Sequence, residues 1–207
     1  MSNSKIKAPL NPDRIVDPKS LPKVDPHWRG DLPHIHKTGC TYFVTFCLVD
    51  AVPRIVWRRE SVEESSDPKE IAQQFDIDPG FGNCILNQPE VAGLVESTML
   101  HFQGDRYALS AWCVMPNHVH AVVTPYSDHT LSGILHSWKS FSAHEINKHA
   151  GGTGRVWQKE SFDHLVHHEK AFEQFVVYTE ENPVVAGLCQ RPEEWPFSSA
   201  RFRSQDE

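Results

Sequence analysis

The sequence has few cysteines and no long apolar run, and each absence excludes a class of protein. Its five cysteines, spread over 207 residues, show no C-x-x-C spacing, so neither a disulfide framework nor a zinc–cysteine site is expected. No stretch is long and apolar enough to cross a bilayer, and the first residues lack the apolar core of a secretory signal. We therefore expect a cytoplasmic protein without a membrane partner.

Basic charge is also scarce, because the formal net charge is −7. Such a balance argues against a nucleic-acid partner, since contacts to phosphate normally rely on surplus Lys and Arg. Residues 1–60, however, hold ten Lys/Arg against six Asp/Glu, so they carry +4 and the other 147 residues carry −11. Residues 131–159 form a second, weakly basic stretch. DNA contacts would be confined to these two stretches, although a solvated surface without any partner also fits so mild an excess.

Composition and periodicity divide the chain into an arm, a domain and a tail. Residues 1–38 are rich in proline and charge and predict an extended basic N-terminal arm, whereas residues 203–207 are a short C-terminal tail. Residues 39–202 form one domain, and 39% hydrophobic residues in the chain are enough for its core. Within it, residues 60–82 are acidic and punctuated by glycine and proline, which indicates a loop with room for one short helix.

Strand and helix patterns alternate along this domain. Strands are predicted where β-branched and aromatic residues gather, over residues 41–49, 107–114, 118–124 and 161–167. Helices are predicted over a segment that Pro89 opens and Gly104 stops, a segment that Thr130 caps and Gly151 ends, and residues 170–182 before Pro183. The order β-α-β-β-α-β-α predicts an α+β fold of the ferredoxin-like, split β-α-β type. It has an antiparallel four-stranded sheet with helices on one face, plus an extra C-terminal helix.

His118 and His120 open the second strand of the predicted hairpin. Residues i and i+2 of a strand point to one face, so the two imidazoles can bind the same cation while Val119 points into the other layer. In a chain with 13 histidines the pattern alone is more often incidental. His34-Ile-His36 repeats it in a proline-flanked loop before the first predicted strand, where packing, capping or solvent contact is expected.

Tyr178 and Asn182 lie four residues apart on the last predicted helix and therefore share a face. An amide oxygen with two imidazoles leaves open positions for phosphate oxygens on a metal ion, and hard oxygen ligands favour magnesium or manganese. A phenol beside such an ion is a candidate nucleophile toward a phosphodiester. Both residues also have plainer interpretations, because tyrosine is common on amphipathic helices and an Asn before Pro183 is a common helix end.

Several motifs in a fixed order resemble the REP-associated tyrosine transposases, which belong to the insertion-sequence 200/605 superfamily of single-tyrosine HUH transposases. The resemblance covers about residues 28–202. Its motifs are W-R-G-D-L-P-H from Trp28, W-C-V-M-P-N-H-V-H from Trp112, Trp157-Gln158, Tyr178 with E-N-P-V-V-A-G-L from Glu181, and W-P-F-S-S from Trp195.

The resemblance implies an enzyme that binds hairpin or palindromic single-stranded DNA and cleaves and rejoins it. Tyr178 would form a 5′-phosphotyrosine intermediate, and His118, His120 and Asn182 would bind a divalent metal, magnesium or manganese. By position, the N-terminal arm and the helix over residues 131–149 would hold the DNA. The candidate DNA contacts are Arg29, Trp138, Lys139, Lys148, Arg155 and Lys159. Such a protein would be a monomer or a homodimer.

Two other functions are weighed against this one. The acidic charge suggests a domesticated relative that binds hairpin DNA without cleaving it. An H-x-H pair on a strand also occurs in barrel metal hydrolases, but such barrels typically need about 250 residues and many βα units. This chain is shorter and its predicted element order differs.

Overall fold

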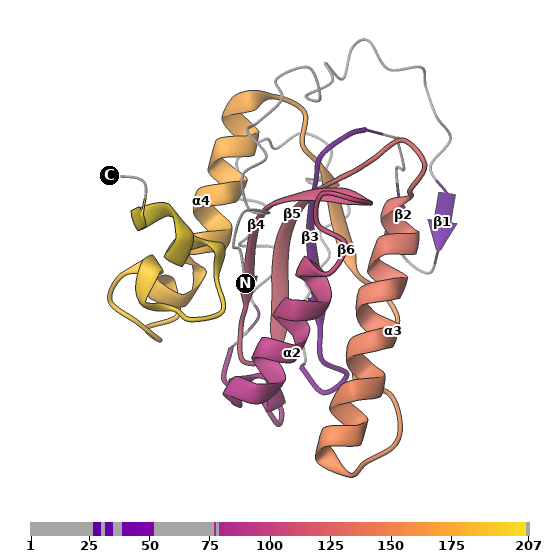
Figure 1. The fold of residues 1–207 in the computed structure, drawn as a ribbon, viewed down its shortest axis with the longest axis vertical. Coiled ribbons are helices and arrows are strands. Elements are labelled where there is room, and N and C mark those ends of the chain that lie inside the picture. The colour runs from indigo at the N-terminus through magenta and orange to yellow at the C-terminus, as the bar shows by residue number, and fades with distance from the viewer. Residues whose placement is uncertain (1–26, 30–31, 35–38, 52–76, 78, 206–207) are drawn as a thin grey trace.

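The computed structural model describes residues 27–29, 32–34, 39–51, 77 and 79–205 of the chain. Its central sheet has four strands in the order β4-β5-β3-β6, and each pair of neighbours is antiparallel (Figure 1). The strands are β3 (Tyr42–Cys47), β4 (Tyr107–Val114), β5 (His118–Pro125) and β6 (Phe162–Leu165). This order is the split β-α-β arrangement, so the predicted fold class is confirmed.

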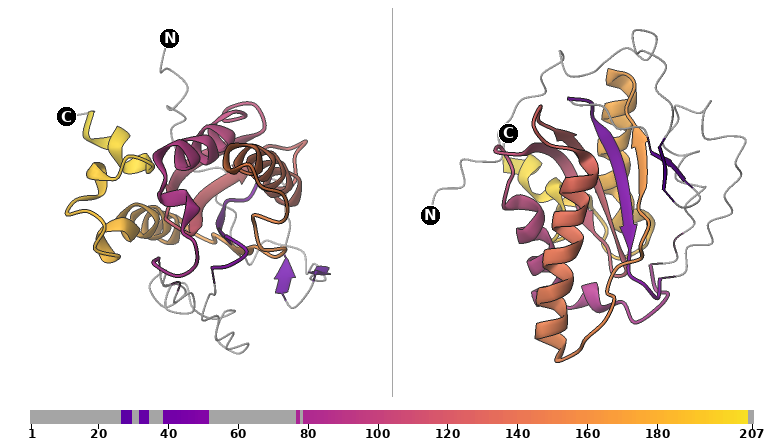
Figure 2. Two further views of the ribbon diagram at one scale, coloured as in Figure 1. Left: turned by 90° about the horizontal axis from the view of Figure 1, so that it is seen from below. Right: turned by 90° about the vertical axis from the view of Figure 1, so that its right-hand side faces the viewer.

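In the described part of the chain, three α-helices cover the two faces of the sheet. They are α2 (Pro89–Leu100), α3 (Leu131–Ala150) and α4 (Glu169–Val185). Helices α2 and α3 lie on one face and α4 lies on the other, as Figures 1 and 2 show. The Thr130 hydroxyl accepts a hydrogen bond from the Gly133 N–H, and α3 ends where Gly151 takes a positive φ of 62°. Both predicted ends of α3 are therefore confirmed.

Side chains of β5 alternate between two hydrophobic layers. Val119, Ala121 and Val123 belong to the larger core, which packs under α2 and α3. Val122 instead joins the smaller core under α4 together with Phe43. Because strand residues alternate, His118 and His120 face the same side as Val122. The alternation in the sequence predicts one apolar row and one functional row on this strand, and the structure has that arrangement.

Helix α4 continues past Pro183 to Val185, so the prediction that it ends before this proline was wrong. Pro183 lies within the last turn and removes only one intrahelical hydrogen bond there. The helix ends instead at a Schellman motif around Gly187, whose φ is 70°. In this motif the Leu188 N–H donates to the Pro183 carbonyl at 2.8 Å, and the Gly187 N–H donates to Val184 at 2.9 Å.

The predicted arm contains a small hairpin. Strands β1 (His27–Arg29) and β2 (Leu32–His34) pair antiparallel, with His34 opposite His27. His34 therefore ends a strand, which corrects the prediction that it lies in a loop before the first strand. Gly30-Asp31 between the strands is a two-residue hairpin signature in the sequence. The rest of the arm and most of the predicted loop at residues 60–82 lie outside the described residues.

Two smaller differences concern element ends. The predicted strands over residues 41–49 and 161–167 are shorter in the structure, because backbone pairing with the neighbouring strands covers only residues 42–47 and 162–165. A 3₁₀-helix, η5 (Ser199–Gln205), runs across the predicted start of the tail. No helix in the described part of the chain has the length and apolar character needed to span a membrane.

Candidate active site

The imidazole rings of His118 and His120 meet on the face of the sheet that α4 covers. Both side chains are buried, and their Nε2 atoms lie 3.1 Å apart. Strand β5 is hydrogen-bonded on both sides, to β3 and to β4, so its backbone cannot shift without breaking two ladders. The sheet therefore fixes the two rings beside each other, as the strand pattern predicted.

Each ring is held at its other nitrogen by a buried polar side chain. His118 Nδ1 donates to the amide oxygen of Asn117 at 2.7 Å, and the Asn117 amide nitrogen donates to the Phe81 carbonyl at 2.8 Å. His120 Nδ1 lies 2.8 Å from the hydroxyl of Thr45, its register partner on β3. The Asn117 contact leaves a lone pair on His118 Nε2, and a hydroxyl that can donate or accept permits either tautomer of His120.

Burial keeps both histidines neutral. It lowers the pKa of His118 to about 3, and it lowers the pKa of His120 well below the usual range, with His118 adding to the effect. Neutral imidazole is the form that binds a metal ion, because a protonated ring has no lone pair to offer. The site is therefore in its metal-binding protonation state at neutral pH.

Helix α4 brings Tyr178 onto this pair. The Tyr178 ring lies 5.4 Å from the His120 ring, centroid to centroid, and packs edge-on against Phe43 at 5.7 Å. Phe43 in turn stacks on His120 at 5.5 Å and on Phe175 of α4 at 4.7 Å. The rings of Tyr178 and His120 therefore both pack against Phe43, and this shared contact limits the distance between them.

Asn182 lies one turn further along α4 and hydrogen-bonds to Tyr178. Burial raises the pKa of Tyr178 to about 12, the hydrogen bond from Asn182 lowers it, and Cys113 raises it. The phenol is therefore protonated at neutral pH. An amide has both a donor nitrogen and an acceptor oxygen, so Asn182 can hold Tyr178 through one and leave the other for a cation.

The donor set fits a divalent metal ion. Two nitrogens bound side by side to one metal, with bonds of roughly 2.1 Å, are about 3 Å apart, and the two Nε2 atoms are 3.1 Å apart. No group of three His, Cys, Asp or Glu side chains suited to a metal occurs among the described residues. A third protein ligand would then be an amide or hydroxyl oxygen, and the Asn182 amide, which hydrogen-bonds to Tyr178, has the right chemistry.

The candidate DNA contacts on α3 differ in their exposure to solvent. Trp138 is buried and its indole N–H donates to the Tyr107 hydroxyl at 2.8 Å, so the prediction that it contacts DNA was wrong. Its helical spacing suits the core equally well, and the core is where it lies. Lys148 is exposed near the end of α3, 3.9 Å from the Glu145 carboxylate. The Arg29 side chain lies outside the described residues.

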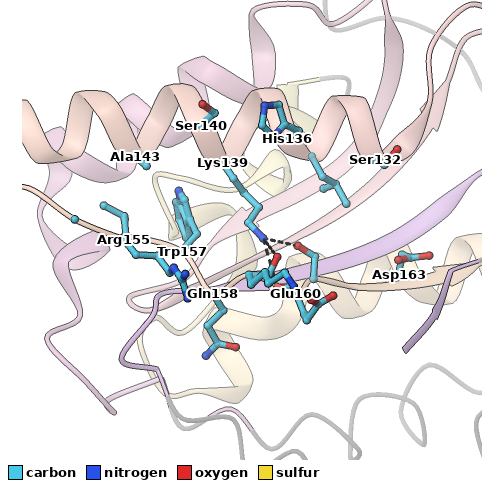
Figure 3. A pocket seen from close by; sticks show the side chains of 15 residues that line it. Ser132, His136, Lys139, Ser140, Ala143, Arg155, Trp157, Gln158, Glu160 and Asp163 are labelled. Carbon is cyan, nitrogen blue, oxygen red and sulfur yellow. Dashed lines mark hydrogen bonds and ion pairs between the residues drawn. The ribbon is translucent and has the colours of Figure 1, made fainter. Parts of the chain in front are cut away.

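Lys139, Arg155 and Lys159 line a groove of about 530 Å³ between α3 and the segment that leads into β6 (Figure 3). The Lys139 ammonium donates to the carbonyls of Lys159 and Glu160 and to the Ser161 hydroxyl, which uses its three N–H donors. Burial lowers the pKa of Lys139 to about 8. Lys139 therefore links α3 to residues 159–161 across the groove, while Arg155 and Lys159 are exposed at its edge.

This groove and the His–Tyr site lie on different faces of the sheet. The groove is bounded by α3, whereas His118 and His120 face α4, which carries Tyr178. A single strand of nucleic acid that touched both would have to pass around an edge or an end of the sheet, and β6, which the groove adjoins, is one of its two edge strands.

Comparison with known proteins shows what this chain is similar to. Residues 92–180 match the family model described as transposase IS200 like. A REP-associated tyrosine transposase of Escherichia coli (strain K12) is 30% identical over 111 residues, which are 51% of this chain and 62% of that protein. The match thus spans less than two thirds of that relative. The structure of a REP-associated tyrosine transposase bound to a REP hairpin superposes with a TM-score of 0.57 at 20% identity, covering 86% of this chain and 87% of the other. The resemblance predicted from the motifs is confirmed.

Proposed function

We propose that this chain, which resembles the REP-associated tyrosine transposases and carries an IS200-like transposase segment, cleaves and rejoins hairpin-containing single-stranded DNA with Tyr178 as the nucleophile. The observation that carries the proposal is the packing of the Tyr178 ring 5.4 Å from His120, whose Nε2 faces that of His118. A nucleophile and a cation-binding pair on one scaffold suit phosphoryl transfer to a side chain.

In the proposed reaction, Tyr178 Oη attacks the phosphorus of a DNA phosphodiester. The Oη–P bond forms, the bond from phosphorus to the 3′ oxygen breaks, and the DNA is left as a 5′-phosphotyrosine and a free 3′ hydroxyl. The proton that leaves the phenol balances the one that the 3′ oxygen gains. Because a phosphotyrosine keeps the bond energy, a 3′ hydroxyl can reverse the step and rejoin a strand.

The surrounding side chains lower the barrier to this step in two ways. Phe43, which stacks on Phe175 and on His120, holds the phenol beside His120, so the nucleophile is oriented before a phosphodiester binds. The Asn182 hydrogen bond favours the phenolate and opposes the effect of burial on the Tyr178 pKa. A magnesium or manganese ion held by His118, His120 and Asn182 would polarise the scissile phosphate.

The groove beside α3 is the proposed site for the DNA backbone. Arg155 and Lys159 are exposed at its edge, and His136, Gln158 and Ser132 supply further polar groups along its walls. Phosphate contacts of this kind position a nucleic acid without reading its sequence. With the chain as a whole at −7 and few cations at the groove, we expect DNA affinity to be moderate and its salt dependence to be that of a small number of phosphate contacts.

The proposal is tested with an end-labelled oligonucleotide that carries the inverted repeats flanking the gene. Wild-type protein with Mg²⁺ or Mn²⁺ should give a free 3′ hydroxyl fragment and a labelled band that migrates with the protein, and neither should form with EDTA. Tyr178→Phe should bind the hairpin normally and give neither product, whereas Tyr126→Phe serves as the matched control. Hairpin binding by wild type without any cleavage would favour the domesticated, non-cleaving alternative.

A further inference from the structure

The segment from Trp195 onward lies along β4 and links it to two helices. The Val114 N–H donates to the Phe197 carbonyl at 2.9 Å, and the Trp195 indole N–H donates to the Val114 carbonyl at 3.0 Å. The Trp112 N–H donates to the Ser199 hydroxyl at 3.0 Å. The W-P-F-S-S motif, whose role the sequence does not reveal, therefore covers the free edge of the sheet beside α4 (Figure 1).

This C-terminal segment, residues 195–203, holds α4 through Glu180. The Glu180 carboxylate is buried and accepts hydrogen bonds from the Ser199 hydroxyl at 2.5 Å and from Arg203 Nε at 2.6 Å. Glu180 lies two residues after Tyr178 and two before Asn182. The carboxylate is thus a fixed point in the turn of α4 that carries the proposed nucleophile and the proposed metal ligand.

The two halves of α4 are anchored by different means. Before Tyr178, the buried residues are apolar and include Phe172 and Phe175. After Tyr178, the buried residues are Thr179, Glu180 and Pro183, none of which is a large apolar side chain. Pro183 has no N–H for the Thr179 carbonyl, which weakens the helix just past the tyrosine. The second half of α4 therefore depends on Glu180 for its attachment.

We propose that Glu180, held by Arg203 and Ser199, is a positioning residue that keeps Tyr178 against His120. This inference rests on the proposed function. The Glu180 carboxylate is buried, and both of its oxygens share the single Arg203 Nε–H while Oε1 also accepts from the Ser199 hydroxyl. Two side chains of the C-terminal segment therefore restrict the position of this turn of α4. A displacement of the phenol by an ångström is enough to lower the rate of an oriented attack severely.

The same segment offers a matched control. Arg201 binds the buried Glu96 carboxylate of α2 through both terminal nitrogens, at 2.8 and 2.9 Å. The Arg201 side chain is 27% exposed and that of Arg203 is 53% exposed. A merely structural role for both pairs predicts that Arg201→Ala does at least as much damage as Arg203→Ala, because the more buried ion pair is the costlier one to break.

The test compares Arg203→Ala, Glu180→Gln and Arg201→Ala in the full chain. Single-turnover cleavage of saturating hairpin DNA should be slower by roughly 10- to 100-fold in the first two, at unchanged hairpin affinity, and unchanged in Arg201→Ala. Arg203→Lys should restore part of the rate. Cleavage by Arg203→Ala at the wild-type rate, or equal slowing by Arg201→Ala, would overturn the inference.

Amide hydrogen exchange distinguishes this inference from the proposed function. Arg203→Ala should increase exchange in the part of α4 after Tyr178, and Arg201→Ala should leave that part protected. This readout needs no cleavage activity, so a wild-type protein that fails to cleave DNA would overturn the proposed function alone. Unchanged exchange of α4 in Arg203→Ala would overturn the positioning role.

Discussion

His118 Nε2 and His120 Nε2 face each other at 3.1 Å in a buried site, and both imidazole rings are in the neutral form at neutral pH, with one N–H each. Without a cation, the two nitrogens can share one proton only if His120 donates, with its Nδ1 accepting from the Thr45 hydroxyl. With a cation, Thr45 can turn and accept instead.

Removing either histidine should weaken metal binding severely. We expect His118→Ala and His120→Ala to bind Mn²⁺ at least roughly 100-fold more weakly than wild type, since loss of even an outer partner is worth 10- to 100-fold. The exposed His136 on α3 provides the control, because His136→Ala leaves the site intact. Titration of Mn²⁺ by electron paramagnetic resonance measures this, and equal affinity in all three variants would contradict the assignment.

The side chains that hydrogen-bond to His118 and His120 should also affect the affinity for the metal ion. Thr45→Val removes the hydroxyl that hydrogen-bonds to His120 Nδ1 and orients the ring, and we expect affinity for Mn²⁺ to fall by roughly 10-fold or more. Asn117→Ala should have a larger effect, because Asn117 also links His118 to the Phe81 carbonyl. Calorimetry gives both values. Wild-type affinity in both variants would show that the rings need no such support.

Local patterns predicted much of this site, and long-range pairing determined the rest. The alternation along residues 118–124 was enough to place both histidines on one face, and the helical spacing of Tyr178 and Asn182 was enough to place them together. Thr45 and Glu180 were not predicted, since their roles depend on the register of β3 with β5 and on a contact from Ser199 and Arg203. No local pattern in a sequence specifies such contacts.

The groove beside α3 should account for part of the DNA affinity. The double substitution Arg155→Glu and Lys159→Glu should weaken hairpin binding and make it less dependent on salt, because fewer counterions are released. Lys148→Glu reverses one charge outside the groove and should have a smaller effect. Fluorescence anisotropy at several salt concentrations measures both quantities. Unchanged affinity in the double variant would remove the groove from the DNA-binding surface.

Stability should fall in mild acid through His164, which packs against Phe162 and Phe175. Burial, and next His167, lower the pKa of His164 to about 4, whereas an unfolded histidine titrates near 6.5. The unfolded state therefore binds more protons between these values, so stability is complete above pH 6.5 and is lost toward pH 4. Between pH 6.5 and pH 4, the free energy of unfolding should fall by about 1–3 kcal/mol less in His164→Phe than in wild type. Urea unfolding at a series of pH values tests it, and parallel curves for variant and wild type would contradict it.

The identity of the nucleophile is the central claim, and peptide mass analysis of the cleaved complex tests it most directly. Wild-type protein is incubated with hairpin DNA and Mn²⁺, digested with nuclease and protease, and searched for a nucleotide adduct. The account predicts one adduct, a nucleotide joined through its 5′ phosphate to Tyr178, and none in Tyr178→Phe. An adduct on any other residue, or cleaved DNA with no adduct at all, would contradict it.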